Sequence, residues 1–109
     1  YEGSISVDAS LMKAAGLVEH EHVHIWNVTN GKRFETYVIP APKGSGTVQI
    51  NGAAAHHANK DDLVIVSSFG HFESSKARAH KPKIVFVDTH NRIKRISRKS
   101  GSQDPLPVV

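Results

Sequence analysis

The chain has 109 residues, a formal net charge of +4 and no cysteine. This length suits one small domain with a single core, and we expect residues 1–109 to form that one domain. The lack of cysteine excludes disulfides, thiolate nucleophiles and cysteine-based zinc sites, and it fits a reducing compartment. No apolar run approaches the roughly 20 residues of a membrane-spanning helix, so we expect a cytoplasmic protein without membrane contact.

The positive charge is concentrated in the last third of the chain. Residues 76–99 carry nine lysines and arginines against one acidic residue, Asp88, so this segment has a net charge of +8 and the remainder −4. A basic segment of this kind can bind nucleic acid, and we keep that function as an alternative. A solvated surface is the simpler interpretation, because no recognisable nucleic-acid-binding module accompanies the charge.

The first elements are a strand and a short helix. Residues 4–7 alternate polar and apolar side chains, as a short half-buried strand does. Asp8 is placed to cap the N-terminus of a helix over residues 9–15, because its carboxylate can accept from free backbone N–H groups. Gly16 suits the left-handed conformation that ends such a helix.

A hairpin follows. Residues 21–28 predict a strand, the dipeptide Asn30-Gly31 favours a tight turn, and residues 34–39 predict the return strand. The alternation of a strand places the side chains of the return strand on two faces. One face carries Arg33, Glu35 and Tyr37, and the other carries Phe34, Thr36 and Val38.

Three histidines alternate at the start of this hairpin, at His20, His22 and His24. Period two puts alternate side chains on one face of a strand, and a metal-binding module is therefore one alternative function. We favour a polar solvent face and expect no metal site, because we find no carboxylate or cysteine that would complete a set of ligands.

The second half contains further short strands separated by turn residues. The apolar run over residues 63–66 predicts a central strand buried on both faces. Proline and glycine mark a loop over residues 40–46, and residues 100–109 are expected to form a loose tail. The other expected elements are strands over residues 47–50, 84–87 and 92–96, one helical turn over residues 53–58, and a short helix or irregular turn over residues 73–79.

Short strands, frequent turns and few helices indicate a mainly β protein, and we expect a closed β-barrel. We find no internal repeat and no linker that would separate a second domain. The pattern does not by itself select one kind of small barrel over another.

Three stretches together resemble the pyruvoyl-dependent aspartate 1-decarboxylase family. They are Glu2-Gly3-Ser4, residues 26–33 (WNVTNGKR) and residues 51–56 (NGAAAH). The resemblance extends from Tyr1 to about Ser68 and fades in the basic last third. It implies a small six-stranded double-psi β-barrel and an enzyme that converts L-aspartate into β-alanine and carbon dioxide, for the synthesis of pantothenate and coenzyme A.

The resemblance also implies a covalent cofactor made from the chain itself. In this family the bond between Gly3 and Ser4 cuts itself, and Ser4 becomes a pyruvoyl group. The serine hydroxyl attacks the preceding carbonyl, which a glycine leaves open, and the fold must supply strain and an oxyanion donor. The pyruvoyl ketone then serves as an electron sink for loss of the substrate carboxylate, as pyridoxal phosphate does elsewhere.

The family's site residues match positions of this chain. By resemblance, Tyr37 returns a proton to the substrate, Arg33 holds a substrate carboxylate, and Thr36 assists self-cleavage and contacts the substrate. Asn51 anchors the loop whose backbone, at Gly52, Ala53 and Ala54, wraps the substrate, and Trp26 and Ile39 fit supporting positions. Each also has a plain alternative, such as a surface charge for Arg33, a packed strand aromatic for Tyr37 or a simple small-residue turn for residues 52–55.

The resemblance finally implies a homotetramer with sites between neighbouring subunits, and a short N-terminal fragment released by self-cleavage. The family begins about twenty residues upstream of Tyr1, in a segment that the sequence does not include. A continuous stretch from Tyr1 to Ser4 is what an uncleaved or truncated precursor would contain. His57 and residues 76–99 match no part of the family's mechanism, and we interpret them as surface variation.

Overall fold

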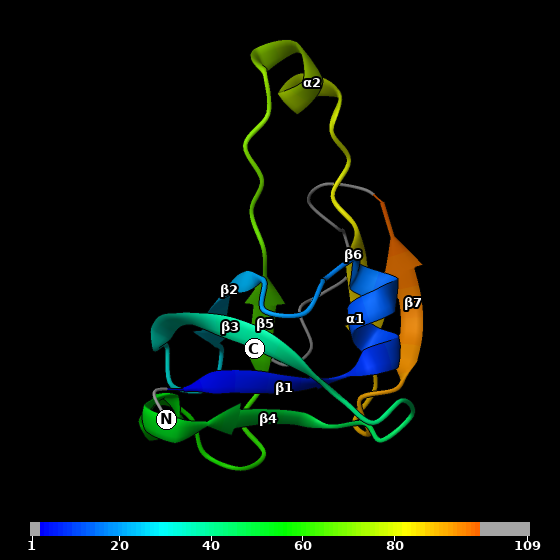
Figure 1. Ribbon diagram of the computed structural model, residues 1–109. Helices are drawn as coiled ribbons and strands as arrows, with labels where there is room; N and C mark the ends of the chain where they lie inside the picture. Colours follow the sequence, from blue (N-terminus) through cyan, green and yellow to red (C-terminus); the bar gives the residue numbers. More distant parts are fainter. Residues whose placement is uncertain (1–2, 99–109) are drawn as a thin grey trace.

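The computed structural model describes residues 3–98. It is mainly β, and its strands are short (Figure 1). In chain order the elements are β1 (Ser4–Asp8), α1 (Ala9–Ala15), β2 (His22–Asn27), β3 (Arg33–Ala41), β4 (Val48–Asn51), the 3-10 helix η1 (Gly52–His57), β5 (Val64–Ser67), α2 (Ser74–Ala79), β6 (Ile84–Val87) and β7 (Ile93–Ser97).

Five strands form one curled sheet, a half-barrel, in the order β4-β1-β3-β2-β5 (Figure 1). Strands β1 and β3 pair in parallel, and the other neighbours in this sheet are antiparallel. Strands β6 and β7 form a separate antiparallel pair. The prediction of a mainly β, barrel-like fold is confirmed, and the described residues contain the seven strands that the sequence pattern predicts, one more than the six that the resemblance implied.

The core is small and aliphatic. Its buried side chains come from β1, α1, β2 and β3, and they are Ile5, Val7, Leu11, Met12, Val23, Ile25 and Val38. Half-buried side chains, including Val85 of β6, pack against it, and α1 contacts β6. Strand β1 lies between β3 and β4, so the core is built around the first strand of the chain.

Helix α1 has the predicted bounds and caps. The Asp8 carboxylate accepts a hydrogen bond from the Ser10 backbone N–H at 2.8 Å, and Gly16 ends the helix with φ of 77°. The Asp8 carboxylate also reaches outside the helix, accepting from the backbone N–H groups of Gly44 (3.0 Å) and Gly46 (2.8 Å). One carboxylate therefore joins the end of β1, the start of α1 and the loop before β4.

Two expectations need correction. Strand β5 covers residues 64–67, and its side chains are half-buried rather than buried on both faces. It is an edge strand paired only with β2, so one side of it lacks the cover that a central strand would have. The expected helical turn is a 3-10 helix that begins one residue earlier, at Gly52.

A long arm connects β5 to β6. It extends away from the sheets and carries α2 at its far end (Figure 1). Every residue from 68 to 81 is exposed, including the rings of Phe69 and Phe72. The short helix expected near residues 73–79 is confirmed as α2. The expected loose tail over residues 100–109 lies outside the described residues.

Candidate functional site

The bond between Gly3 and Ser4 lies at the buried start of β1. Ser4 is fully buried and pairs with Asn51 across the β1–β4 ladder. The side-chain amide of Asn51 donates to the hydroxyl of Ser4 and to that of Ser6, both at 2.9 Å. The predicted loop anchor therefore contacts the predicted reactive serine directly, although 47 residues separate them in the sequence.

Gly3 adopts φ of +135°, a conformation that residues with a side chain rarely adopt. A Cβ atom at this position would lie 3.4 Å from the Cβ and backbone nitrogen of Ala54 and from the carbonyl oxygen of Asn51. The beginning of η1 therefore packs directly against the Gly3-Ser4 bond. The structure brings Gly3, Ser4, Asn51 and Ala54 together, and their roles stay predictions.

The buried Asn27 fixes the far end of η1. Its Nδ2 donates to the carbonyl oxygen of His57 at 3.1 Å and to the Asp62 carboxylate at 2.8 Å. Its Oδ1 accepts from the backbone N–H of Thr29 and of Asn30. The hydrogen bond from Asn27, with a second from the backbone of Asn59, lowers the pKa of Asp62. Sequence analysis missed this anchor, although an asparagine on the inward face of a strand was visible in the pattern.

Strand β3 presents the other predicted residues on alternating faces. Arg33, Glu35 and Tyr37 are exposed, whereas Thr36 is half-buried opposite Val23. The predicted division of this strand is confirmed. Ile39 is half-buried and pairs with Ser6, and the paired residues Ile5 and Val38 directly follow Ser4 and Tyr37. Tyr37 and Ile39 therefore lie on the strand segment that flanks Ser4.

Arg33 lies at the opposite end of that segment. Its guanidinium stands 4.7 Å from the centre of the Trp26 ring, the residue with which it pairs across the hairpin. Four residues of strand separate Arg33 from Tyr37, which is about 13 Å of backbone. Within one chain, Arg33 is thus far from Ser4 along the sheet, and its guanidinium packs on the ring of Trp26 instead.

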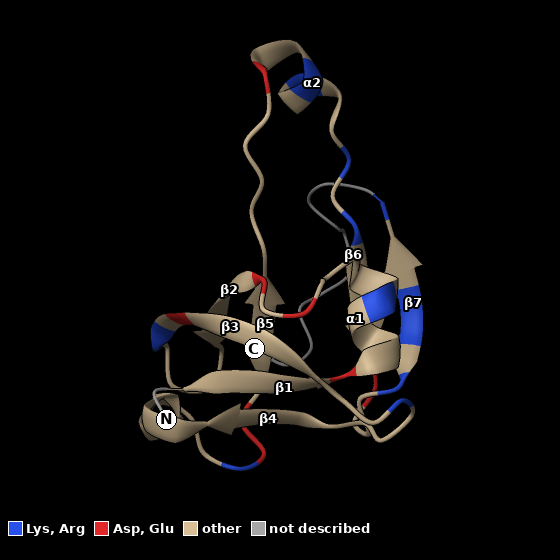
Figure 2. Ribbon diagram, viewed as in Figure 1, with Lys and Arg blue, Asp and Glu red and all other residues tan. Residues whose placement is uncertain are grey.

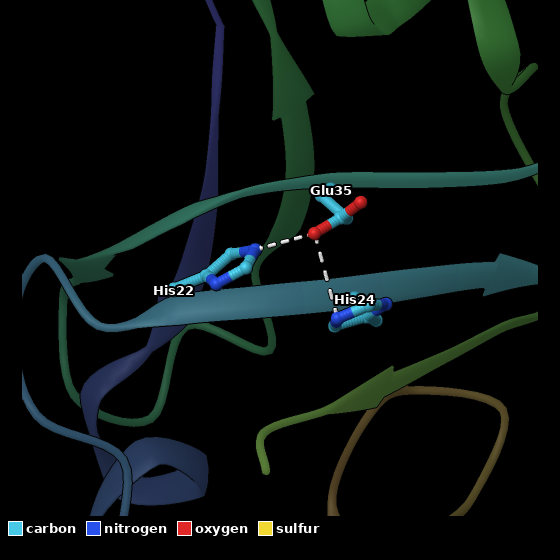
Figure 3. A group of neighbouring side chains, drawn as sticks. All are labelled: His22, His24 and Glu35. Carbon is cyan, nitrogen blue, oxygen red and sulfur yellow. Dashed lines mark hydrogen bonds and ion pairs between the residues drawn. The ribbon is translucent and has the colours of Figure 1, made fainter.

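A second group of side chains lies on the outer face of the β2–β3 hairpin (Figure 3). Nε2 of His22 lies 2.8 Å and Nε2 of His24 lies 3.5 Å from the same carboxylate oxygen of Glu35. The expectation that no carboxylate completes a ligand set with these histidines was wrong, because Glu35 stands opposite His24 in the hairpin register. His20 is not in this group, since its φ of +71° turns it out of the strand toward Tyr37.

The basic residues of segment 76–99 do not form one element. In the described part they are distributed over α2, the strand β7 and the chain around β6 (Figure 2). The Arg95 guanidinium lies 4.5 Å from the centre of the Phe86 ring, and so part of this charge packs on its own hairpin. Within the described residues, no helix is both long and apolar enough to span a membrane.

A model of the aspartate decarboxylase family matches residues 1–94. The chain belongs to the aspartate decarboxylase family. Relatives named aspartate 1-decarboxylase occur in Leptothrix cholodnii (48% identity, 96% of this chain and 79% of the relative), Acinetobacter baumannii (50%, 85% and 74%) and Chromobacterium violaceum (46%, 94% and 82%). The resemblance identified in the sequence is confirmed.

The family match also corrects one expectation. The resemblance does not fade after Ser68, because the match continues through the arm and into β7. Most of the basic segment is therefore part of the family's domain. The comparisons give no support to the alternative of a non-catalytic, nucleic-acid-binding barrel.

Proposed function

We propose that this member of the aspartate decarboxylase family removes the α-carboxylate of L-aspartate as carbon dioxide and leaves β-alanine, a precursor of pantothenate. The family match over residues 1–94 and the identity of 48% to the Leptothrix cholodnii relative support this reaction. The observation that carries the proposal is the buried Ser4 hydroxyl, hydrogen-bonded by Asn51 and directly preceded by a glycine with positive φ.

The proposed cofactor is a pyruvoyl group made from Ser4. The surroundings of Ser4 fit a small, flat, uncharged group, because it is enclosed by backbone and by the amide of Asn51. A Cβ atom at Gly3 would already be in contact with Ala54, so the space beside the scissile bond accommodates only small residues. When formed, this ketone would take up the substrate amine and accept the electron pair released with carbon dioxide.

Self-cleavage would begin with attack of the Ser4 hydroxyl oxygen on the carbonyl carbon of Gly3. The Gly3–Ser4 amide bond breaks and an ester bond forms, with a free amine on Ser4. Loss of the Cα proton of Ser4 then expels the Gly3 carboxylate and ends the N-terminal fragment there. Water replaces the nitrogen of the remaining dehydroalanine, releasing ammonia and leaving the keto group. Asn51 orients the attacking hydroxyl, and Thr36 is proposed to assist this step.

The other site residues would bind and orient the substrate. Arg33 pairs a planar guanidinium with a substrate carboxylate, and its packing on Trp26 limits its rotamers. Backbone N–H groups of Gly52, Ala53 and Ala54 would approach the substrate closely, because these residues themselves carry no large side chain. Tyr37 would deliver a proton to the α-carbon from its hydroxyl, a role that depends on where the hydroxyl is positioned.

We further propose that the enzyme is a homotetramer whose sites lie between neighbouring subunits. Arg33 and Tyr37 are separated by about 13 Å of strand, which exceeds the length of aspartate, so one chain does not offer Arg33 to a substrate at its own Ser4. Both side chains are exposed and available to a neighbouring copy. The cytoplasmic location stays a prediction.

Intact-mass spectrometry of the full-length protein tests the proposal. We expect two fragments divided between Gly3 and Ser4, the larger one lacking its amino group and carrying a keto group, together with formation of β-alanine from aspartate. Ser4→Ala should give one uncut, inactive chain. Ser6→Ala is the matched control, because Ser6 accepts from the same Asn51 amide at the same distance, and it should still cleave. An uncut wild-type chain after prolonged warming, or an active Ser4→Ala protein, would refute the proposal.

A further inference from the structure

The group formed by His22, His24 and Glu35 is not used by the proposed decarboxylation. One nitrogen from each histidine and one oxygen from the glutamate all lie within 4.8 Å of one another. Figure 3 shows the two histidine rings of β2 directed toward the Glu35 carboxylate of the neighbouring strand β3. These three residue types supply the nitrogen and oxygen ligands that first-row divalent metal ions take in proteins.

The geometry follows from the hairpin. His22 and His24 are two residues apart on β2, so they share one face, and their ring centres are 5.3 Å apart. Glu35 pairs directly with His24 on β3, and directly opposite residues of an antiparallel ladder also share a face. The turn at residues 28–32 sets the register, and the ligands are thus held by regular backbone rather than by a loop.

We propose that His22, His24 and Glu35 form a binding site for a divalent transition-metal ion, with Zn²⁺ as the probe ion. Ligand atoms bound tetrahedrally to zinc at about 2.05 Å lie roughly 3.3 Å from one another. The two distances to the Glu35 oxygen, 2.8 and 3.5 Å, bracket that value. The two histidine nitrogens also lie within 4.8 Å of each other, so rotation of the imidazoles about their side-chain bonds would have to close the remaining gap between them.

The site has room for further ligands. A cavity of about 250 Å³ next to it is lined by His22, His24, Glu21, Phe69 and His71. Water can fill an open position on the ion, as it does in zinc sites with three protein ligands, and His71 lines the same cavity from the arm. The Phe69 ring packs edge-on against His24 with centres 5.0 Å apart, which limits rotation of that imidazole.

This site is separate from the proposed chemistry, although it stands close to it. Glu35 lies between Arg33 and Tyr37 on the same exposed face of β3. A bound dication would place positive charge beside the arginine that is proposed to receive the substrate carboxylate. Metal binding at this site does not depend on Ser4, so it can be tested apart from the decarboxylase proposal.

Isothermal titration calorimetry with ZnCl₂ on tag-free, full-length protein tests the site. We expect one ion per chain, and we expect His24→Gln and Glu35→Gln each to weaken binding at least about tenfold. His90→Gln is the matched control, because it removes an exposed imidazole from the turn between β6 and β7 and should leave the affinity unchanged. Absence of saturable binding, or equal affinity in the Glu35→Gln variant, would overturn the proposal.

Three further measurements separate a lost metal site from other causes of weak binding. Co²⁺ in place of Zn²⁺ should give visible absorption bands of a four-coordinate site in the wild type, and these bands should be lost in His24→Gln. Both variants change exposed or half-exposed side chains, and equal melting temperatures without metal would show that folding is intact. Ser4→Ala should bind Zn²⁺ with wild-type affinity, so failure of the metal site and failure of the proposed decarboxylase function are distinguishable.

Discussion

The two ends of the candidate site are built in opposite ways. Around Ser4, the side chains are buried and hydrogen-bonded within one chain, with Asn51 and Ala54 in direct contact with the scissile segment. On the β2–β3 face, Arg33 and Tyr37 are exposed, and they contact the neighbouring rings of Trp26 and His20. The first environment is therefore enclosed within the described residues, whereas the second is open to solvent.

This difference separates two requirements of the proposed reaction. Self-cleavage needs a fixed geometry between atoms of adjacent residues, and a buried strand end held by a ladder supplies it. Substrate binding needs an accessible site and a positive charge that water does not fully screen. The charge of an exposed arginine is screened less when the surface of another subunit covers it. The contrast predicts that changes near Ser4 alter maturation, whereas changes on the β2–β3 face alter catalysis after maturation.

Subunit mixing gives the largest expected effect. Ser4→Ala and Arg33→Ala should each be inactive as pure proteins. Co-expressed at equal levels, they should recover activity at about one quarter of the sites, because one subunit then supplies Ser4 and its neighbour supplies Arg33. Formation of β-alanine by the purified mixture measures this. A mixture as inactive as its parents would show that Ser4 and Arg33 act within one chain.

Tyr37→Phe should next lower kcat about 10³-fold, since removal of a positioned proton donor costs this much in general acid catalysis. The mass of the purified variant should show normal cleavage, because the aromatic ring and the β1–β3 pairing remain. The KM for aspartate should change little. Unchanged kcat, or an uncut chain, would contradict the prediction that residues near Ser4 serve maturation and residues of the β2–β3 face serve catalysis.

Asn51→Ala should slow self-cleavage about tenfold, because the Ser4 and Ser6 hydroxyls lose a shared donor, and each such hydrogen bond contributes about 1 kcal/mol. The time course of fragment formation after synthesis measures the rate. Gln49→Ala, at an exposed position of the same strand, is the control and should cleave as the wild type does. Equal cleavage rates in the two variants would show that Asn51 does not contribute to self-cleavage.

The smallest effect concerns stability in acid. The Ser10 hydroxyl, at 2.6 Å, and the backbone N–H groups of Gly46, Ser10 and Gly44 hold the pKa of the Asp8 carboxyl well below its usual 3.8. A lowered pKa in the folded state means that the stabilisation is present above about pH 4 and is lost as the pH falls below it. Urea midpoints between pH 7 and pH 2 should therefore fall.

Asp8→Asn should melt several degrees lower at pH 7 and lose less stability on acidification than the wild type. The matched control is Asp61→Asn, at an exposed turn position whose φ of +73° an asparagine adopts readily. An acid dependence of the same size in Asp8→Asn and the wild type would show that Asp8 does not contribute to it.

Local features of the fold could be predicted where the chemistry is local. The caps of α1 involve residues within eight positions of one another, and both were predicted because an aspartate and a glycine have strong preferences there. The position of β5 at the edge of the sheet could not be predicted in this way. A run of four apolar residues is compatible with a central strand or an edge strand, and only the order of strands decides between them.

The candidate site shows the same limit. Ser4, Asn51 and Ala54 could be named through resemblance to a family, and the structure brings them together. Glu35 was missed as a partner of His22 and His24, although the hairpin turn and strand lengths could have placed it opposite His24. The contact of Asn27 with His57 and Asp62 depends on packing between distant segments, which no pattern within one strand reveals.

Strand β1 begins at the residue where the chain is proposed to cut itself. It is flanked by β3 on one side and β4 on the other, and Asp8 fastens its far end to the loop before β4. A break before Ser4 would leave the new chain terminus paired with β4 from its first residue and with β3 from Ile5, and these two ladders would limit its fraying. The proposed cut at this one point would therefore leave the newly made end inside a sheet that its two neighbouring strands still hold.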